Sequence, residues 1–367
     1  MNESHVLAEV SNENQTLVAV VQQDHRAAYF YIYPSEENSE RFQVRACWLR
    51  NLAAAPQQED SAALALGQPP MLAAEFCRNL EGEAPLNPEG LMVVWTESDD
   101  GAALWYYGQL LAVIPGWSLY IDHSVCYSAS CIKESPLAYP LGSASTNTQY
   151  ALAESTRQFW RSWQREEGNP WPKMQNDYQA IYDQHFGPSV KYYAIDQGKW
   201  PPMAITQHER DGIYYFLTMG VSIRPMPWVE ILFNDEAPRY RRMEMGIAID
   251  GQYMTEENAV QMASALAGFA HAPWAKITWF GEGHTLESEV APQGYEGYVL
   301  SSSFYPYSEH LTLPKQYGDP VNIFWASPVF EAERLLAHAT PNGGHDLVSQ
   351  LREQGVDHIF RPRQPLC

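Results

Sequence analysis

The chain has 367 residues, of which 45% are hydrophobic, with 22 Tyr and 12 Trp. That apolar content excludes a disordered chain, and the length is enough for two folded domains. The formal net charge of −21 gives a surface that repels DNA, RNA and anionic membranes, so we expect none of these as a direct partner.

Other features of the whole chain indicate in which cellular compartment the protein lies. No apolar run reaches the ~18 residues of a membrane span, and no positive charge precedes an apolar stretch at the N-terminus, so a secretory signal is not expected. Five cysteines without paired C-x-x-C spacing favour free thiols over disulfides or a zinc site. We therefore expect a cytoplasmic protein with no bound metal.

The negative charge is unevenly distributed. Residues 1–149 hold 18 Asp and Glu against 6 Lys and Arg, a net of −12, and residues 150–367 hold 26 against 17, a net of −9. The N-terminal part is more acidic for its length. Ordinary solubility would explain this excess, and so would a docking face for a basic protein.

The first part of the chain, residues 1–147, is predicted to be a smaller α+β domain. Apolar, β-branched or aromatic stretches predict strands at 16–21, 28–33, 42–49, 91–96 and 103–111. In the third stretch Phe42, Val44, Ala46 and Trp48 alternate on one expected face. Helical character is predicted in part of 53–66 and in a short helix at 70–80.

Glu97-Ser-Asp-Asp-Gly101 predicts a tight hairpin turn, because Asp-Gly tolerates positive φ. Residues 141–148 are small and polar and read as a linker. An amphipathic linker helix follows within 148–169, with Leu152, Phe159, Trp160 and Trp163 on one face. We interpret that face as packing between the two domains.

Residues 170–367 are predicted to form the second domain, a mixed β-sheet flanked by helices, so the fold class is α/β (α+β). Predicted helices are 174–186, 255–270, 330–339 and 346–354. Predicted strands are 190–195, 213–219, 243–249, 276–280, 298–302 and 321–326.

The strand predicted at 213–219 ends at Gly220 and runs into a stiff turn. Pro225 and Pro227 fix φ there and remove two backbone donors. The turn therefore presents Ser222 and Arg224 on a rigid loop at a strand end, a common place for binding residues.

Recognisable catalytic chemistry is missing from the sequence. It contains no P-loop, no nucleophile elbow and no H-E-x-x-H zinc helix. We predict no catalytic, cofactor-binding or metal-binding residues. Scattered His, Glu and Cys side chains could still converge in three dimensions, which leaves an enzyme with an unrecognised site as an alternative.

Four segments, in order, resemble the Suppressor of fused family. The first is YFLTMGVSIRPM at 215–226, similar to the family's strand followed by G-x-S and, in bacterial members, R-P-M. The second is RMEMGIAI at 242–249, similar to its R-x-E-L strand, with Glu244 as the acidic residue. The third, 262–286, ends in the G-H-T turn with His284, and the fourth, 321–336, resembles the family's strand–Pro–helix. The resemblance covers about residues 170–367.

The resemblance implies a non-enzymatic domain that acts by binding proteins. Animal members restrain transcription factors and place an acidic residue after G-x-S, whereas this chain has Ile223. Bacterial members include immunity proteins that neutralise toxins, often nucleases. We therefore expect an immunity or antitoxin-type protein with a basic protein partner. A regulator that sequesters a transcription factor or another cellular protein is the first alternative.

The residues predicted to contact a partner come from two places. The motifs supply Ser222, Arg224, Glu244 and His284, with Arg224 and Glu244 as a candidate buried ion pair. The acidic hairpin supplies Glu97, Asp99 and Asp100, for which a merely solvated tip is the plainer interpretation.

Overall fold

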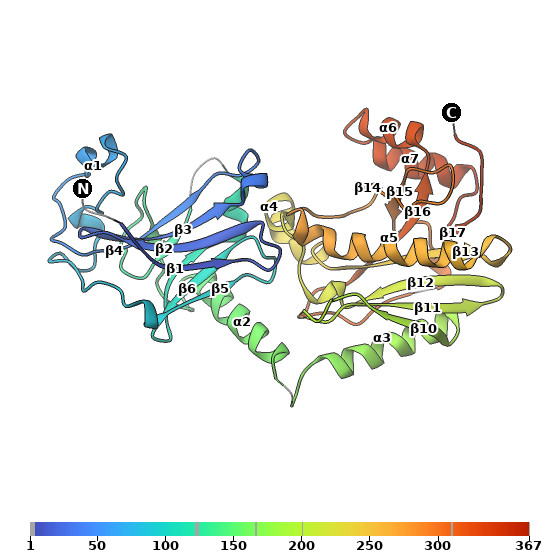
Figure 1. Ribbon diagram of the computed structural model, residues 1–367, viewed down its shortest axis with the longest axis horizontal. Helices are drawn as coiled ribbons and strands as arrows, with labels where there is room; N and C mark the ends of the chain where they lie inside the picture. The colour runs from blue at the N-terminus through green and yellow to red at the C-terminus, as the bar shows by residue number, and fades with distance from the viewer. Residues whose placement is uncertain (1–3, 122–124, 166, 200, 310, 367) are drawn as a thin grey trace. The chain divides into compact units, whose positions relative to one another are not determined.

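The computed structural model describes residues 4–121, 125–165, 167–199, 201–309 and 311–366. It divides into two compact units (Figure 1). Unit 1 comprises residues 1–161 with 274–277, and unit 2 comprises residues 162–273 with 278–367. Strands and helices occur in both, which confirms the predicted two-domain α+β class.

Unit 1 is built from two β-sheets. The first is antiparallel throughout, in the order β1 (His5–Ser11), β2 (Leu17–Gln23), β3 (Ala27–Pro34), β4 (Arg45–Asn51). The second has the order β5 (Leu91–Trp95), β6 (Ala102–Tyr106), β7 (Gln109–Ile114), β8 (Tyr127–Ser128), β9 (Tyr139–Pro140). Helix α1 (Ser61–Ala65) lies in the connection between the sheets.

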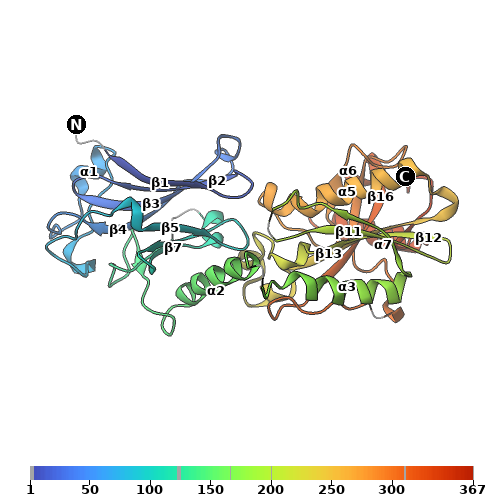
Figure 2. The ribbon, with the colours of Figure 1, turned by 60° about the horizontal axis from the view of Figure 1, so that its bottom comes forward.

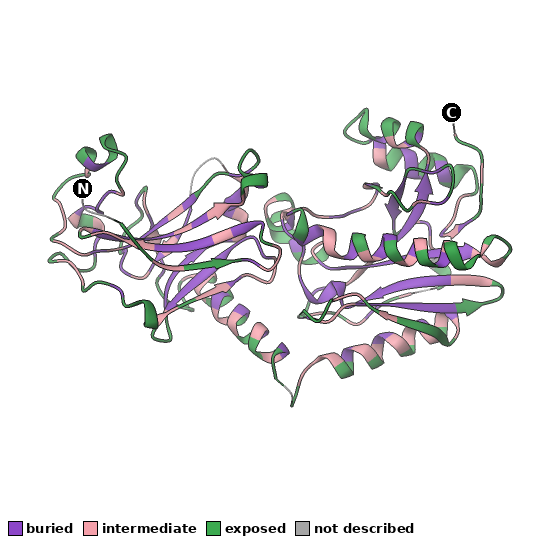
Figure 3. Ribbon diagram, viewed as in Figure 1, coloured by how far each residue is buried: buried purple, intermediate pink, exposed green. Residues whose placement is uncertain are grey.

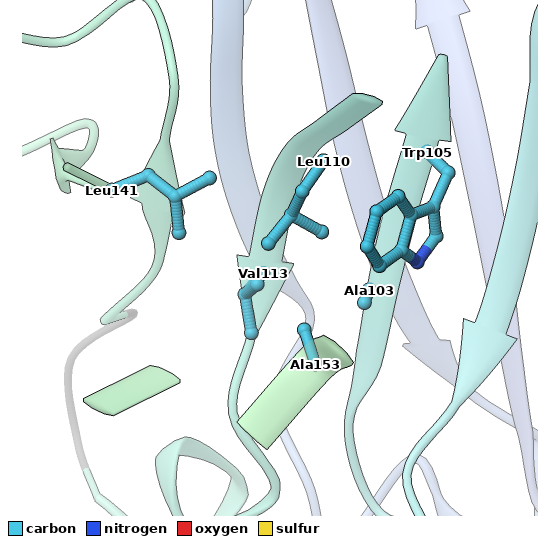
Figure 4. Packing of buried hydrophobic residues seen from close by; sticks show 6 residues of the cluster. All are labelled: Ala103, Trp105, Leu110, Val113, Leu141 and Ala153. Carbon is cyan, nitrogen blue, oxygen red and sulfur yellow. The ribbon is translucent and has the colours of Figure 1, made fainter. Parts of the chain in front are cut away.

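Helix α2 (Thr148–Trp163) occupies the region of the predicted linker helix. Its Ala153 packs against β6 and β7 in a cluster shown in Figure 4. The guanidinium of Arg157 lies 3.8 Å from the Trp105 ring centre. The indole nitrogen of Trp160 donates to the carbonyl of Trp95 over 2.9 Å. These contacts bind the helix to the second sheet. Packing of its apolar face between the two domains stays a prediction.

Two predictions for unit 1 are wrong. Stretch 103–111 is two strands, because Tyr107 and Gly108 both have positive φ (46° and 81°) and turn the chain back. Stretch 70–80 holds only a 3-10 turn, Ala74–Phe76. The Asn51 side chain bonds both backbone groups of Leu72, at 2.7 and 3.0 Å, and so competes with a helical backbone there.

The alternation expected in stretch 42–49 does not separate a buried face from an exposed one. Val44 is 47% exposed, while Arg45, Cys47 and Leu49 are fully buried. Trp48 is buried as well, so both faces of β4 are covered. Strand β1 is mostly exposed and lacks the apolar pattern that would have predicted it.

Unit 2 contains a mixed sheet, as predicted. Its order is β10 (Ser189–Ala194), β11 (Ala204–Arg210), β12 (Ile213–Met219), β13 (Met243–Asp250), β16 (Asn322–Val329), β15 (Gly297–Ser301), β14 (Thr285–Glu287). β17 (Ile359–Phe360) also pairs with β13. β13 runs parallel to both β16 and β17, and the other neighbours are antiparallel.

Helices cover both faces of this sheet. In Figures 1 and 2, α3 (Trp171–Phe186) lies along one face of β10–β12 and α5 (Glu256–Ala275) lies over the other. The short α4 (Val229–Phe233) follows the proline-rich turn, and α6 (Glu331–His338) and α7 (Gly343–Glu353) pack on β15. Buried residues gather on the strands, and exposed residues on the outer sides of the helices (Figure 3).

The predicted strand at 276–280 is wrong: Ile277 has a φ of 46°, and the stretch is irregular. The helix predicted at 346–354 begins three residues earlier than expected, at Gly343. β11 was missed because Thr206, Gln207 and His208 are polar yet buried, which hides the apolar pattern of a strand.

The centre of this sheet is closely packed around Trp325 of β16. The Tyr305 ring stacks on it at 5.2 Å, and Phe186 and Tyr215 meet it edge-on at 5.8 and 6.3 Å. On the neighbouring strand, Gly246 leaves room for the indole. A Cβ at that position would lie 2.8 Å from Trp325 Cζ3. The glycine is therefore needed for space.

We expect Gly246→Ala to destabilise unit 2 by about 1–3 kcal/mol, because the methyl group overpacks a dense core. The matched control is Gly268→Ala within α5, where a Cβ meets nothing within 4 Å. That change should stabilise by roughly 0.5–1 kcal/mol through helix propensity. Urea denaturation measures both, and equal effects at the two sites would contradict the packing argument.

His208 of β11 is fully buried in unit 2. Its Nδ1 lies 2.7 Å from the carbonyl of Gly187 and its Nε2 lies 3.0 Å from the Thr206 hydroxyl. Burial lowers the pKa of His208, and the Gly187 carbonyl and the Asp183 carboxylate oppose that shift without reversing it. The ring is therefore neutral in the folded protein at neutral pH.

A depressed histidine pKa stabilises the fold above the unfolded value of 6.5 and ceases to do so as pH falls through the folded value. We expect the melting temperature to fall between pH 7.5 and 5.5. The fall should be smaller in His208→Gln, which cannot gain that proton. An unchanged slope in this variant would show that other groups, such as the buried His358 with its lowered pKa, control the pH response.

Candidate functional site

The loop after β12 turns sharply at Gly220. This residue has a φ of 99°, in the region that favours glycine, and a Cβ there would lie 2.3 Å from the carbonyl oxygen of Pro202. One 3-10 turn, Val221–Ile223, follows, and Arg224 then returns to extended geometry before Pro225. The glycine of the G-x-S motif is thus required by both backbone angle and space.

Glu244 of β13 accepts hydrogen bonds from this loop and holds it in place. Its Oε1 accepts the backbone N–H groups of Gly220 and Ser222, each at 3.0 Å, and the Ser222 hydroxyl at 2.7 Å. Its Oε2 accepts the Thr218 hydroxyl at 2.7 Å. The carboxyl group is fully buried. Burial raises the pKa of Glu244, and the four hydrogen bonds only partly offset that effect.

Arg242, the residue directly before β13, holds the other side of the loop. Its Nη1 donates to the carbonyls of Ser222 and Ile223, at 3.1 and 2.5 Å. Its Nε donates to Asp319 at 2.7 Å, and Arg241 donates to the same carboxylate with two nitrogens, at 2.7 and 3.0 Å. The R-x-E pattern therefore pairs an arginine for loop carbonyls with a glutamate for loop amides.

Helix α3 completes the arrangement with two tyrosines. The hydroxyl of Tyr178 lies 2.9 Å from the Ser222 hydroxyl and accepts the side-chain amide of Gln316 at 3.1 Å. The hydroxyl of Tyr182 donates to the carbonyl of Thr218 at 2.9 Å. Burial raises the pKa of both phenols. The loop is therefore fixed by polar contacts from a strand and a helix.

The structure brings together two of the predicted site residues. Ser222 and Glu244 are hydrogen-bonded and fully buried, and Arg224 is also buried, at 6% exposure. The side chains of Ser222 and Glu244 therefore hold the loop from inside the domain. The Arg224–Glu244 ion pair and a direct contact of these residues with a partner stay predictions.

His284 lies elsewhere in unit 2, in a pocket of about 520 Å³ formed by the segment before β14, the end of α6 and the start of α7. Its ring meets Trp279 edge-on at 4.5 Å. Burial lowers the pKa of His284, and the nearby His345 adds to that shift. His338 also lines the pocket and lies 2.6 Å from the Thr285 hydroxyl. Among the described residues, no three His, Cys, Asp or Glu side chains are arranged to bind a metal ion.

The acidic hairpin between β5 and β6 is not a solvated tip. Asp99 and Asp100 are each 3% exposed, and Glu97 is half-buried. Asp99 accepts the side-chain amides of Asn12, on its carbonyl at 3.1 Å, and Asn14, on its carboxylate at 3.2 Å. This corrects the plainer interpretation given to the two aspartates, which failed because sequence distance hid the partners supplied by the β1–β2 connection.

Asp100 belongs to a second buried polar cluster. Its carboxylate accepts hydroxyls from Ser98 and Tyr120, at 2.6 and 3.0 Å. Arg45 of β4 donates to the carbonyls of Asp100 and Pro115, at 2.6 and 2.9 Å. Burial lowers the pKa of Arg45 to about 10, although Asp100 opposes the shift. Sequence reasoning missed this arginine, whose only signal is a charge within a predicted strand.

The comparisons with known proteins agree with the four motif segments. Residues 199–364 match the family model described as Suppressor of fused protein. This match lies in unit 2 and confirms the resemblance found in the sequence. A domain of this family suggests a protein-binding or regulatory module. No curated protein matches the chain. No helix among the described residues is long and apolar enough to span a membrane.

We expect Glu244→Ala to destabilise unit 2 by about 3 kcal/mol or more, because it leaves buried amides and hydroxyls without an acceptor. Glu244→Gln is the matched control. Its Oε1 keeps three bonds, and the Thr218 hydroxyl can turn to donate to the Met245 carbonyl, 3.3 Å away. We expect a cost within about 1–1.5 kcal/mol for this change. Chemical denaturation of both variants tests this difference, and equal losses would show that the carboxyl group does not hold the loop.

Proposed function

We propose that this chain is a non-enzymatic immunity or antitoxin-type protein that neutralises a basic toxin such as a nuclease. The observation that carries the proposal is the excess of exposed carboxylates on unit 1. Within the described part of residues 4–149, nine acidic side chains are exposed: Glu9, Glu36, Glu37, Glu40, Glu59, Glu75, Glu81, Glu89 and Glu134. Three basic side chains are exposed there: Arg41, Arg78 and Lys133.

The remaining arginines of this region make contacts within unit 1. Arg26 pairs with Asp60 at 3.0 Å, Arg50 lies 3.6 Å from Glu83, and Arg45 is buried. Within the described part of residues 4–149, exposed carboxylates therefore outnumber exposed cations nine to three. This distribution supports a surface of unit 1 that is negatively charged on balance.

A nuclease needs a positively charged cleft to hold nucleic acid. An acidic protein can occupy such a cleft, and long-range attraction makes the association fast and dependent on salt. The loop after β12 supports a binding mode different from that of the animal relatives. The residue at the position of their acidic group, Ile223, is apolar and fully buried.

The test is affinity capture from the native cell with the full chain, at low and high salt, followed by identification of what is retained. We expect a basic protein with nuclease activity that the chain inhibits, held at low salt and released at high salt because exposed charges are screened. Capture of a transcription factor would support the alternative of a sequestering regulator. Binding that salt does not change would contradict the electrostatic proposal.

Charge variants sharpen this test with the captured protein in hand. The triple change Glu36→Gln, Glu37→Gln and Glu40→Gln removes three exposed charges from unit 1 and should slow association. The matched control removes three exposed charges from unit 2, through Glu289→Gln, Glu296→Gln and Glu353→Gln. Equal slowing by both triples would mean that net charge, and no particular face, attracts the partner.

A further inference from the structure

Unit 1 holds four buried cysteines that neither the fold class nor the proposed function uses. Cys47, Cys77, Cys126 and Cys131 are all free thiols, and each is at most 3% exposed. They occur as two neighbouring pairs. Cys47 interacts with Cys126 through the side chains, and Cys77 faces Cys131 across an isolated antiparallel β-bridge.

The backbone of the Cys77–Cys131 bridge has a specific geometry. Arg78 donates its N–H to the carbonyl of Ser130 at 2.9 Å, and Ile132 donates to the carbonyl of Phe76 at 2.9 Å. The hydrogen bonds therefore flank the two cysteines, which makes them a non-hydrogen-bonded antiparallel pair. In such pairs the Cα atoms lie about 4.5 Å apart and the side chains approach closely. This separation falls within the range that a disulfide spans.

The thiols point to separate acceptors in the reduced protein. Cys77 Sγ lies 3.3 Å from the carbonyl of Leu72, and Cys131 Sγ lies 3.0 Å from that of Lys133. Rotation about each Cα–Cβ bond would turn them towards one another without a change of backbone. Both sit one residue from solvent, since the neighbouring Arg78 and Ile132 are exposed. Cys47 is instead followed by the fully buried Trp48 and Leu49.

We propose that Cys77 and Cys131 form a reversible disulfide, so that this bridge is a redox modification site. The oxidant is a low-molecular-weight disulfide such as oxidised glutathione. One cysteine thiolate attacks a sulfur of the oxidant, breaks its S–S bond and releases one thiol. The other cysteine then attacks the mixed disulfide and releases the second thiol. The two cysteines lose two electrons and two protons in total, and the oxidant is reduced to two thiols.

The bond would tie an irregular segment to the second sheet. Residues 77–131 enclose β5, β6 and β7, and cross-linking their ends restricts the unfolded chain. The irregular segment around residue 72 is also held by hydrogen bonds from the side chains of Asn51, Asp60 and Tyr29. Oxidation would therefore stiffen unit 1.

The test uses the full chain, incubated with oxidised glutathione at pH 8 and, separately, refolded in a glutathione redox buffer. After acid alkylation and trypsin digestion, we expect peptide 51–78 linked to peptide 79–133, with the loss of two hydrogen atoms. The link should persist in Cys126→Ala and disappear in Cys131→Ala. Thermal denaturation should show a melting temperature several degrees higher for the linked protein, reversed by dithiothreitol.

Two results would overturn the proposal. One is a link between peptide 46–50, which carries Cys47, and peptide 79–133, because it would show that Cys47 and Cys126 are the reactive pair. The other is the absence of any link after both treatments, because refolding exposes the thiols and removes burial as an obstacle. A Cys77–Cys131 link without a rise in melting temperature would reject the stiffening effect.

Discussion

The structure of unit 2 depends on the way β13 holds the loop after β12. Glu244 of β13 accepts hydrogen bonds from backbone amides of the loop, and Arg242, directly before β13, donates to its carbonyls. The loop turns through a glycine with positive φ, so its backbone N–H and C=O groups cannot pair with a neighbouring strand. Leaving these groups buried without a hydrogen-bond partner would cost free energy. The buried side chains of Glu244 and Arg242 therefore allow a sharp turn to lie inside the domain. The motifs G-x-S and R-x-E supply the residues that make this arrangement.

Part of the fold of unit 2 could be predicted because strands such as β12 and β13 are mainly apolar on both faces. β12 was predicted with its observed bounds, and β13 to within one residue. β11 was missed because His208 and Thr206 are polar but buried. Their side chains are hydrogen-bonded to one another inside the core, so their polarity does not indicate exposure. In unit 1 the hairpin at 103–111 was missed because the turn also needs a positive φ at Tyr107, a residue type that does not predict it, and Gly108 was the single turn signal.

The candidate site was predictable in part. The motifs pointed to Ser222 and Glu244, and the structure joins them, but burial could not be read from the sequence because both residues are polar. The acidic hairpin shows the same difficulty in another form. Asp99 and Asp100 look like a solvated turn until Asn12 and Tyr120, far away in sequence, are seen to bind them. Net charge was a better guide to the surface, because it does not depend on which individual carboxylates are buried.

The hydrogen bonds that converge on Glu244 run in one direction. Gln316 donates to Tyr178, and the hydroxyl of Ser222 donates to the carboxyl of Glu244, so Tyr178 is left to donate to Ser222. Each proton in this chain already has its acceptor. Ser222 thus has a carboxyl neighbour, as an activated nucleophile would, yet its proton and its lone pair are both engaged inside the domain. The resemblance to a catalytic serine is superficial, and the same atoms serve as an ordered support for the backbone.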